Sequence, residues 1–293
     1  MNDKIAGKFR GTGVKAGLMY GMAEFYGGGA FVIINTFFLV FLTKALGMPA
    51  ALAGAIPMVG KVWDAITDPM MGNITDRTSS RFGPKRLYIL IGGILSAIAF
   101  ISLWTTIPSR STTVQFIYYI VMYCLFSTCF TIIMVPYNGL LPDMVDSYDI
   151  RSKFSSLRMI WSTVGAILAG LVPTLMIKDT LNTSMYLKVA IIFGILFGFA
   201  AVVTFIGTWE KVKPPVKTKL RDSFSEAASV FKSRSFKIFI GIYLSGQCAM
   251  DFVSGMAIYY VDDVLGGYDK GYLTMLMGVL LSSQLIGMLI FTP

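Results

Sequence analysis

Residues 49–75 read PAALAGAIPMVGKVWDAITDPMMGNIT, a stretch that is apolar enough to cross a membrane and yet carries three charges in its middle. A helix turns by about 100° per residue, so Lys61, Asp64 and Asp68 fall within about 60° of one another on one face. Each charge near a bilayer centre costs roughly 2.5–3.5 kcal/mol on insertion scales. A segment that served only as an anchor would not carry three of them, and the stripe predicts an ion or substrate pathway.

The composition is that of a membrane protein. Of 293 residues, 55% are hydrophobic and 14% are charged, whereas soluble domains carry about 25% charged residues. Histidine is absent, which excludes an imidazole proton relay and a histidine metal site. Cys124, Cys129 and Cys248 lie in apolar runs without zinc-ligand spacing and are interpreted as packing residues. No nucleophile–base set or metal-ligand cluster is visible, so we expect neither an enzyme nor a cofactor.

The net charge of +9 is spread unevenly over the connections between apolar runs. Basic residues gather before the first run and after the second, fourth and sixth, while the alternate connections hold few. By the positive-inside rule this pattern predicts a cytoplasmic N-terminus, and it accounts for the charge without nucleic-acid binding. The first run is too long for a signal-peptide core. We therefore expect a multi-pass protein of the cell membrane, in contact with the lipid bilayer and with no cleavable signal.

Eight apolar runs have the length of membrane spans. They lie near 14–43, 50–74, 87–107, 113–141, 154–177, 184–208, 236–264 and 271–293. Lipid offers the backbone no hydrogen-bond partners, so these runs are predicted to be helices in an all-α membrane protein. Gly17, Gly21 and the glycines at 27–29 stand where neighbouring helices could approach closely, the alternative being loosely packed glycines without such a role.

One long polar connection, 210–235, divides the first six predicted helices from the last two. It contains Pro214-Pro215, and its segment DSFSEAASVFKSR is predicted to form an amphipathic helix on the inner membrane surface. The sequence thus predicts a six-helix bundle at 1–209, a cytoplasmic linker at 210–235 and a partial second bundle at 236–293. Two helices do not mirror six, so we expect that the sequence is cut short by about four helices.

The loop after the second run carries a motif. It reads Gly72-Asn-Ile-Thr-Asp76-Arg77-Thr-Ser-Ser-Arg81-Phe-Gly83-Pro-Lys85-Arg86. It resembles the G-x-x-x-D-R-x-x-x-R-x-G-[RK]-[RK] signature of the major facilitator superfamily, with Pro84 inserted before the last basic pair. In that superfamily the loop governs conformational switching, a role that the resemblance implies for Gly72, Asp76, Arg77, Arg81 and Gly83. The alternative is an ordinary positive-inside loop.

Further motifs narrow the resemblance. Tyr20-Gly-Met-Ala-Glu24-Phe25, Val62-Trp63-Asp64-Ala-Ile-Thr67-Asp68-Pro69 and Pro136-Tyr137-Asn138 are similar to segments of the glycoside–pentoside–hexuronide:cation symporters, the melibiose-carrier family. The implied fold is that of the major facilitator superfamily, with a complete N-terminal six-helix half and the first two helices of the C-terminal half. The implied function is secondary active symport of a sugar or glycoside with Na⁺ or H⁺, Li⁺ being a third candidate.

The resemblance implies a cation site at Asp64 and Asp68, assisted by Thr67 and Thr131. The residues themselves support it: carboxylates four positions apart on a helix repel each other when both are ionised, and a bound Na⁺ or proton relieves that repulsion. Lys61 is a candidate to neutralise one carboxylate in the empty state. The alternative is a static ion pair that holds helices together.

The candidate substrate site is less completely matched. It comprises Glu24, Tyr20, Lys61, Asn138 and Arg158. The resemblance makes Glu24 the acid that binds sugar hydroxyls, with structural pairing to Lys61 or Arg158 as the alternative. Arg158 matches a family arginine near the sugar, or serves as an interface anchor.

The sequence also departs from the melibiose carriers. Met134 and Asn138 stand where those carriers have a substrate-binding aspartate and tryptophan, and Ala23 replaces a lysine found in some members. Asp251 is a further intramembrane acid of open role. The departures keep open a carrier of a lipid-like solute or organic anion, and a non-transporting fragment or sensor is a third reading.

Overall fold

The computed structural model describes residues 13–109, 111–210 and 232–264 with isolated positions between 272 and 283, and this part of the chain forms helices joined by short connections, without a strand. Six of its helices are long and apolar enough to cross a membrane, namely Val14–Phe38, Pro84–Leu103, Thr112–Met144, Tyr148–Met176, Thr183–Gly207 and Arg234–Tyr259. The helix α4 (Ala50–Arg77) has the length but, with its interior charges, is too polar to be counted among them. The predicted all-α membrane protein is confirmed.

The first membrane helix changes its winding along its length. It begins as α2 (Val14–Gly21) and α3 (Ala23–Ile33) and continues as two π-helical segments, η2 (Ile34–Phe38) and η3 (Phe41–Ala45). A turn with Gly47 at φ +70° then leads into α4. π-Helical segments are rare in proteins, and those that do occur are often found at functional sites.

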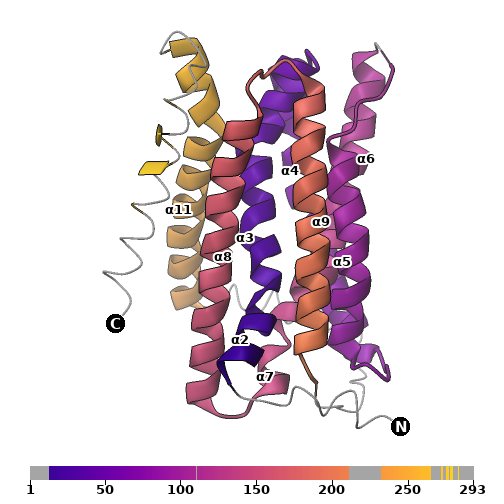
Figure 1. The fold of residues 1–293 in the computed structure, drawn as a ribbon, viewed down its shortest axis with the longest axis vertical. Helices are drawn as coiled ribbons and strands as arrows, with labels where there is room; N and C mark the ends of the chain where they lie inside the picture. The colour runs from indigo at the N-terminus through magenta and orange to yellow at the C-terminus, as the bar shows by residue number, and fades with distance from the viewer. Residues whose placement is uncertain are drawn as a thin grey trace.

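The helices of the bundle pack side by side along their lengths. α5 (Pro84–Leu103) packs between α6 (Thr112–Asn138) and α9 (Thr183–Gly207), α4 lies along α6, and α2 and α3 lie along α8 (Tyr148–Met176) (Figure 1). The short α7 (Leu141–Met144) follows α6 at the lower end in Figure 1, here termed the basic end because Arg81, Lys85, Arg86 and Arg151 lie there.

Glycines set the spacing between α2/α3 and α8. A β-carbon on Gly21 would lie 3.1 Å from the backbone nitrogen of Arg158, and one on Gly28 would lie 2.6 Å from the Ser162 carbonyl oxygen. Only glycine leaves room for backbones this close. The predicted close approach at these small residues is therefore confirmed.

An aromatic cluster anchors the end of the bundle opposite the basic end. The Phe41 ring lies 5.3 Å from Trp104 and 5.2 Å from Tyr186 by ring centroids, and Trp104 stacks on Tyr186. All three side chains are almost fully buried. This cluster ties the π-helical part of the first helix to α5 and α9.

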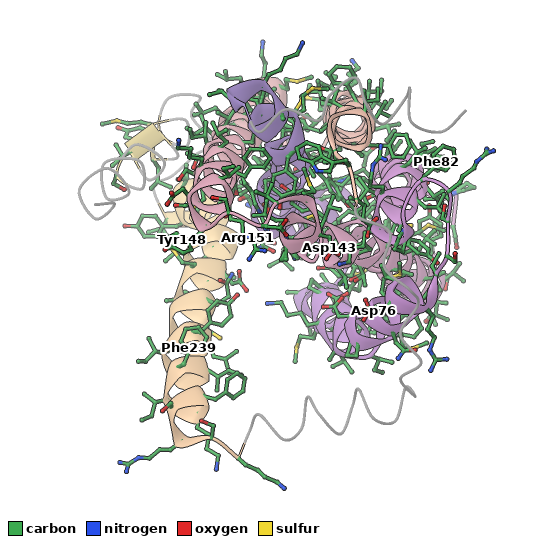
Figure 2. The ribbon with its side chains drawn as sticks, turned by 90° about the horizontal axis from the view of Figure 1, so that it is seen from below. Asp76, Phe82, Asp143, Tyr148, Arg151 and Phe239 are labelled. Atoms are coloured by element: carbon green, nitrogen blue, oxygen red, sulfur yellow. The ribbon has the colours of Figure 1, made fainter. Side chains whose placement is uncertain are left out.

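The helix α11 (Arg234–Tyr259), extended by η4 (Tyr260–Val264), attaches to the bundle through its second half. It contacts η2, and Ala257, Ile258 and Val261 are buried. Its first half is almost entirely exposed in the described part of the chain. The helix therefore meets the bundle away from the basic end and separates from it toward that end, as the position of Phe239 shows in Figure 2.

The first seven predicted spans coincide with helices to within about four residues at each end, except at the start of the fifth span. α8 begins at Tyr148, before its apolar run, because a polar first stretch with Asp149, Arg151 and Lys153 extends the helix beyond the membrane-spanning part. The predicted amphipathic helix of the 210–235 connection and most of the predicted span at 271–293 lie outside the described residues.

Candidate functional site

Two carboxylates of α4 each accept a hydrogen bond from a hydroxyl of α6. Ser127 Oγ donates to Asp64 Oδ1, and Thr131 Oγ1 donates to Asp68 Oδ1 at 2.7 Å. The partners are 63 residues apart in both pairs, so the helices run in the same direction and keep one register. The hydroxyls are buried, whereas Asp64 is half-buried and Asp68 is exposed. Both carboxylates thus have one fixed oxygen and one side that an ion can approach.

Close contacts one turn before and one turn after these pairs continue the same register. A β-carbon on Gly60 would lie 2.1 Å from the ring of Tyr123, and one on Gly72 would lie 3.9 Å from Val135. Gly60 leaves no room for a side chain, so α4 and α6 approach closely there. This approach brings Asp64 and Asp68 within reach of the short Ser127 and Thr131 side chains.

Thr131 is hydrogen-bonded to Asp68, whereas Thr67 and Lys61 form no hydrogen bond or ion pair with either carboxylate. Thr67 Oγ1 donates to the Trp63 carbonyl oxygen at 3.2 Å within α4. Lys61 Nζ lies 2.7 Å from Asp251 Oδ2 of α11. The structure thus pairs Lys61 with a carboxylate of another helix, in place of Asp64 or Asp68. Ser127 is the residue that sequence reasoning missed, although it precedes Thr131 by the same four positions that separate the aspartates.

Asp251 joins α11 to two other helices. Besides Lys61, it accepts hydrogen bonds from Asn35 Nδ2 at 3.1 Å and from Gln247 Nε2 at 3.3 Å. Asn35 belongs to the π-helical segment η2. Two further contacts link the same helices nearer the end opposite the basic end, between the hydroxyls of Thr43 and Tyr259 at 2.5 Å and between Lys44 and Asp263 at 3.0 Å.

The second cluster forms around Arg158 of α8. Its Nε donates to Glu24 Oε1 at 2.6 Å, and its Nη2 donates to Asn138 Oδ1 at 2.5 Å while also pairing with Glu24. The guanidinium lies 4.8 Å from the centroid of the Tyr137 ring. Of the two pairings left open for Glu24, the structure shows the one with Arg158. Both side chains keep some exposure, at 12% for Glu24 and 27% for Arg158, so a ligand can reach them.

Tyr20 packs against Tyr137, the ring on which the Arg158 guanidinium lies. It is fully buried and stacks on Tyr137 with ring centroids 4.9 Å apart. The side chain therefore does not face open space in this conformation, and a direct ligand contact of Tyr20 stays a prediction. Met134 lies beside Glu24, since its terminal methyl and Glu24 Oε2 are each 2.8 Å from the β-carbon position of Gly27.

The first turn of α5, directly after the loop that follows α4, is fastened to the end of α6 and to α7. Lys85 Nζ donates to the Gly139 carbonyl oxygen at 2.7 Å and pairs with Asp143 of α7. Gly83 has φ +96°, a conformation that favours glycine. Seen from the basic end, Asp143 lies near the centre of the bundle, while Asp76 and Phe82 lie at its periphery (Figure 2). Arg81 stacks on Phe82, with its Cζ 4.7 Å from the ring centroid.

Glu210 caps the start of α5, a contact that the sequence did not reveal. Its Oε2 accepts from the backbone nitrogen of Lys85 at 3.0 Å and from that of Arg86 at 3.4 Å. Burial raises the pKa of Glu210 above its ordinary value, although the two backbone donors and Lys85 oppose the shift. Arg86 Nη2 donates to the Phe205 carbonyl oxygen at 2.7 Å. The first turn of α5, at the end of the motif, is thus held by residues at the end of α9 and just after it.

Within residues 13–109, 111–210 and 232–264, no group of three or more His, Cys, Asp or Glu side chains is arranged to hold a metal ion. The Asp64–Asp68 pair is a smaller, oxygen-only arrangement. Its four side chains offer oxygen ligands only, the type that hard cations prefer.

A membrane bundle with carboxylates and hydroxyls facing each other between its spans has the architecture of a transporter. Residues 19–293 match the family described as MFS/sugar transport protein, and the chain belongs to that family. This confirms the resemblance to the symporter family and the expectation that the protein is not an enzyme.

Curated relatives carry transporter names. The chain is 38% identical over 158 residues to an uncharacterized symporter of Synechocystis sp., covering 52% of this chain and 29% of that protein. It is 25% identical over 214 residues to the isoprimeverose transporter of Lactiplantibacillus pentosus, covering 69% and 44%. It is 29% identical over 136 residues to sodium-dependent lysophosphatidylcholine symporter 1 of Xenopus tropicalis, covering 46% and 26%. The chain spans less than half of the length of each of these relatives.

Proposed function

We propose that the protein is a secondary active symporter that moves a sugar or glycoside together with Na⁺ or H⁺. The observation that carries the proposal is the pair of carboxylate–hydroxyl contacts, Asp64 with Ser127 and Asp68 with Thr131. A transporter of this class needs an interior site at which a cation is bound reversibly, and these four side chains form one between α4 and α6.

The chemistry of the site favours a monovalent cation. Two carboxylates one helical turn apart repel each other when ionised, and one positive charge between them relieves that repulsion. Carboxylate and hydroxyl oxygens are ligands of the hard type that Na⁺ prefers. Pro69 has no N–H, so the Ala65 carbonyl lacks its usual intrahelical donor and adds a further oxygen next to Asp68. This oxygen-rich set favours Na⁺ over a proton, in line with the sodium-dependent relative.

The Arg158 cluster suits an uncharged, polyhydroxylated solute. Glu24 and Arg158 neutralise each other, so the cluster offers strong donors and acceptors without a net charge. Asn138, which is exposed, adds an amide to the same surface. The name of the isoprimeverose transporter supports a sugar as cargo. The apolar Met134 beside Glu24 is the observation that favours the second candidate, a lipid-like solute with a polar headgroup.

The arrangement of α11 suits alternating access. The bundle and α11 touch at Asp251, Tyr259 and Asp263 and separate toward the basic end. With the basic end in the cytoplasm, as the positive-inside rule proposes, α11 contacts the bundle on the outer side and diverges from it on the cytoplasmic side.

Uptake into proteoliposomes tests the proposal. Radiolabelled pentose- and hexose-containing disaccharides should accumulate when a Na⁺ or pH gradient is imposed and not without one. Asp64→Asn should abolish the dependence on the gradient, whereas Asp179→Asn, which alters an exposed carboxylate in the connection before α9, should not. Glu24→Gln should weaken sugar binding and leave cation binding intact. Gradient-driven uptake of lysophosphatidylcholine without any sugar uptake would select the second candidate, and gradient-dependent uptake by Asp64→Asn would contradict the cation site.

A further inference from the structure

Lys61 occupies a position from which it can reach either of two groups of carboxylates. It shares one face of α4 with Asp64 and Asp68, three and seven residues further on, and side chains three or four apart on a helix are neighbours. In this conformation its Nζ instead lies 2.7 Å from Asp251 on α11. The Lys61 side chain is 66% exposed, so packing does not fix it in that direction.

Asp251 is well equipped to hold the lysine. Its Oδ1 accepts hydrogen bonds from Asn35 and Gln247, which orient the carboxylate and leave Oδ2 for Lys61. At 25% exposure it is more shielded from water than Lys61, and a shielded carboxylate attracts an ammonium group more strongly than an exposed one such as Asp68.

We propose that Asp251 is a positioning residue for the cation site: by holding Lys61 on α11 it keeps the ammonium group away from Asp64 and Asp68. The inference rests on the proposed function, because it takes these carboxylates to be the cation site. A lysine ammonium and Na⁺ carry the same charge and compete for the same oxygens. Removal of the Asp251 charge therefore lets Lys61 swing toward Asp64 and occupy the site from within.

The position of the pair links cation binding to the contact between the bundle and α11. Lys61–Asp251 lies in the same contact region as the Thr43–Tyr259 and Lys44–Asp263 contacts. Separation of α11 from the bundle takes Asp251 away and releases Lys61. A cation on Asp64 and Asp68 excludes Lys61 from them and so favours its return to Asp251. Linkage then requires that cation binding stabilise this contact, and that the contact strengthen cation binding.

Na⁺ titration of the purified protein by isothermal calorimetry tests the proposal. Asp251→Asn should weaken Na⁺ binding by about tenfold, the effect of one charge-assisted hydrogen bond. Addition of Lys61→Gln to Asp251→Asn should restore the wild-type affinity, because no competing ammonium remains. Addition of Lys44→Gln, which removes a lysine of the same contact region that does not lie on α4, should not restore it. Asp251→Glu should retain near-wild-type binding.

Two outcomes would overturn the positioning role: an unchanged Na⁺ affinity in Asp251→Asn, or a loss that Lys61→Gln does not reverse, which would make Asp251 a structural residue. Should Asp251→Asn not fold, Asp251→Ser with and without Lys61→Gln gives the same comparison. Failure of the cation site itself gives a different result, because wild-type protein would then show no Na⁺ binding, or Asp64→Asn would bind Na⁺ like the wild type.

Discussion

Gly60 of α4 lies against the ring of Tyr123 so closely that a β-carbon would come within 2.1 Å of it. Tyr123 is buried and cannot move aside without disturbing the core. We expect Gly60→Ala to destabilise the protein by about 1–3 kcal/mol, the usual effect of overpacking, and to weaken cation binding by pushing Asp64 away from Ser127. Thermal unfolding in detergent measures the first effect. Gly54→Ala on the same helix is the matched control, because nothing lies within 4 Å of its β-carbon position. Equal melting temperatures for the two variants would refute the close packing.

The hydroxyls of α6 should contribute to cation affinity. Ser127→Ala and Thr131→Val each remove the donor that fixes one carboxylate oxygen. Loss of one hydrogen bond is expected to weaken Na⁺ binding by about two- to tenfold, as measured by calorimetry. Thr128→Val is the control on the same helix, since Thr128 contacts Trp63 and the Cys124 carbonyl and neither aspartate. A larger loss of affinity in Thr128→Val than in Ser127→Ala would argue against the site.

The forked shape of the Arg158 guanidinium, and not only its charge, should contribute to substrate affinity. Arg158→Lys keeps the positive charge, but a lysine cannot hold Glu24 and Asn138 together in the same geometry. We expect the substrate concentration for half-maximal uptake to rise about tenfold, with Na⁺ affinity little changed. Arg151→Lys, at the basic end of the same helix, is the control. A parallel loss of Na⁺ affinity would show that the two clusters are not separate sites.

Glu210 should make stability depend on pH. Its folded-state pKa lies above its unfolded value, so its favourable contribution is fully present below the unfolded pKa and is lost as the pH rises through the folded pKa. Glu210→Gln keeps an acceptor for the Lys85 backbone nitrogen but does not ionise. We therefore expect the melting temperature of Glu210→Gln to rise relative to the wild type between pH 4 and pH 7. Asp179→Asn serves as the control, and a difference that does not change with pH would contradict the role of Glu210.

The helices were largely predictable from the sequence. The length of each apolar run and the basic residues in the connections can be read from local composition alone. The cation-site candidates were also accessible, since the spacing of Asp64 and Asp68 marks one helix face. Ser127 was missed because a lone serine in an apolar run gives no signal until its distance to Thr131 is compared with the spacing of the aspartates. To predict the Asp64–Ser127 contact from that comparison, one would have needed to know which residues of α4 face which residues of α6. That alignment is set by the packing of the helices.

Pairings between distant segments were not predictable. Lys61 and Asp251 are 190 residues apart, and the charge pattern of α4 alone left Asp64 as the nearer partner for Lys61. Glu210 was assigned to a polar linker by composition, whereas the structure folds it onto the first turn of α5. In each case the partner is chosen by how the helices meet, and that information is spread over the whole chain.

Facing residues of α4 and α6 differ by 63 in sequence number. This constant offset determines what happens when the two helices slip along each other. A slip of α4 by one turn, about 5.4 Å, in one direction would bring Asp64 against the Tyr123 ring, where only the missing side chain of Gly60 leaves space. A slip in the other direction would bring Asp68 against the apolar Val135 and leave it without a donor. Either misalignment keeps just one acid paired with a hydroxyl. The native alignment is therefore selected by the same side chains that form the proposed ion site, and substitutions that remove the acids should also loosen the choice of alignment.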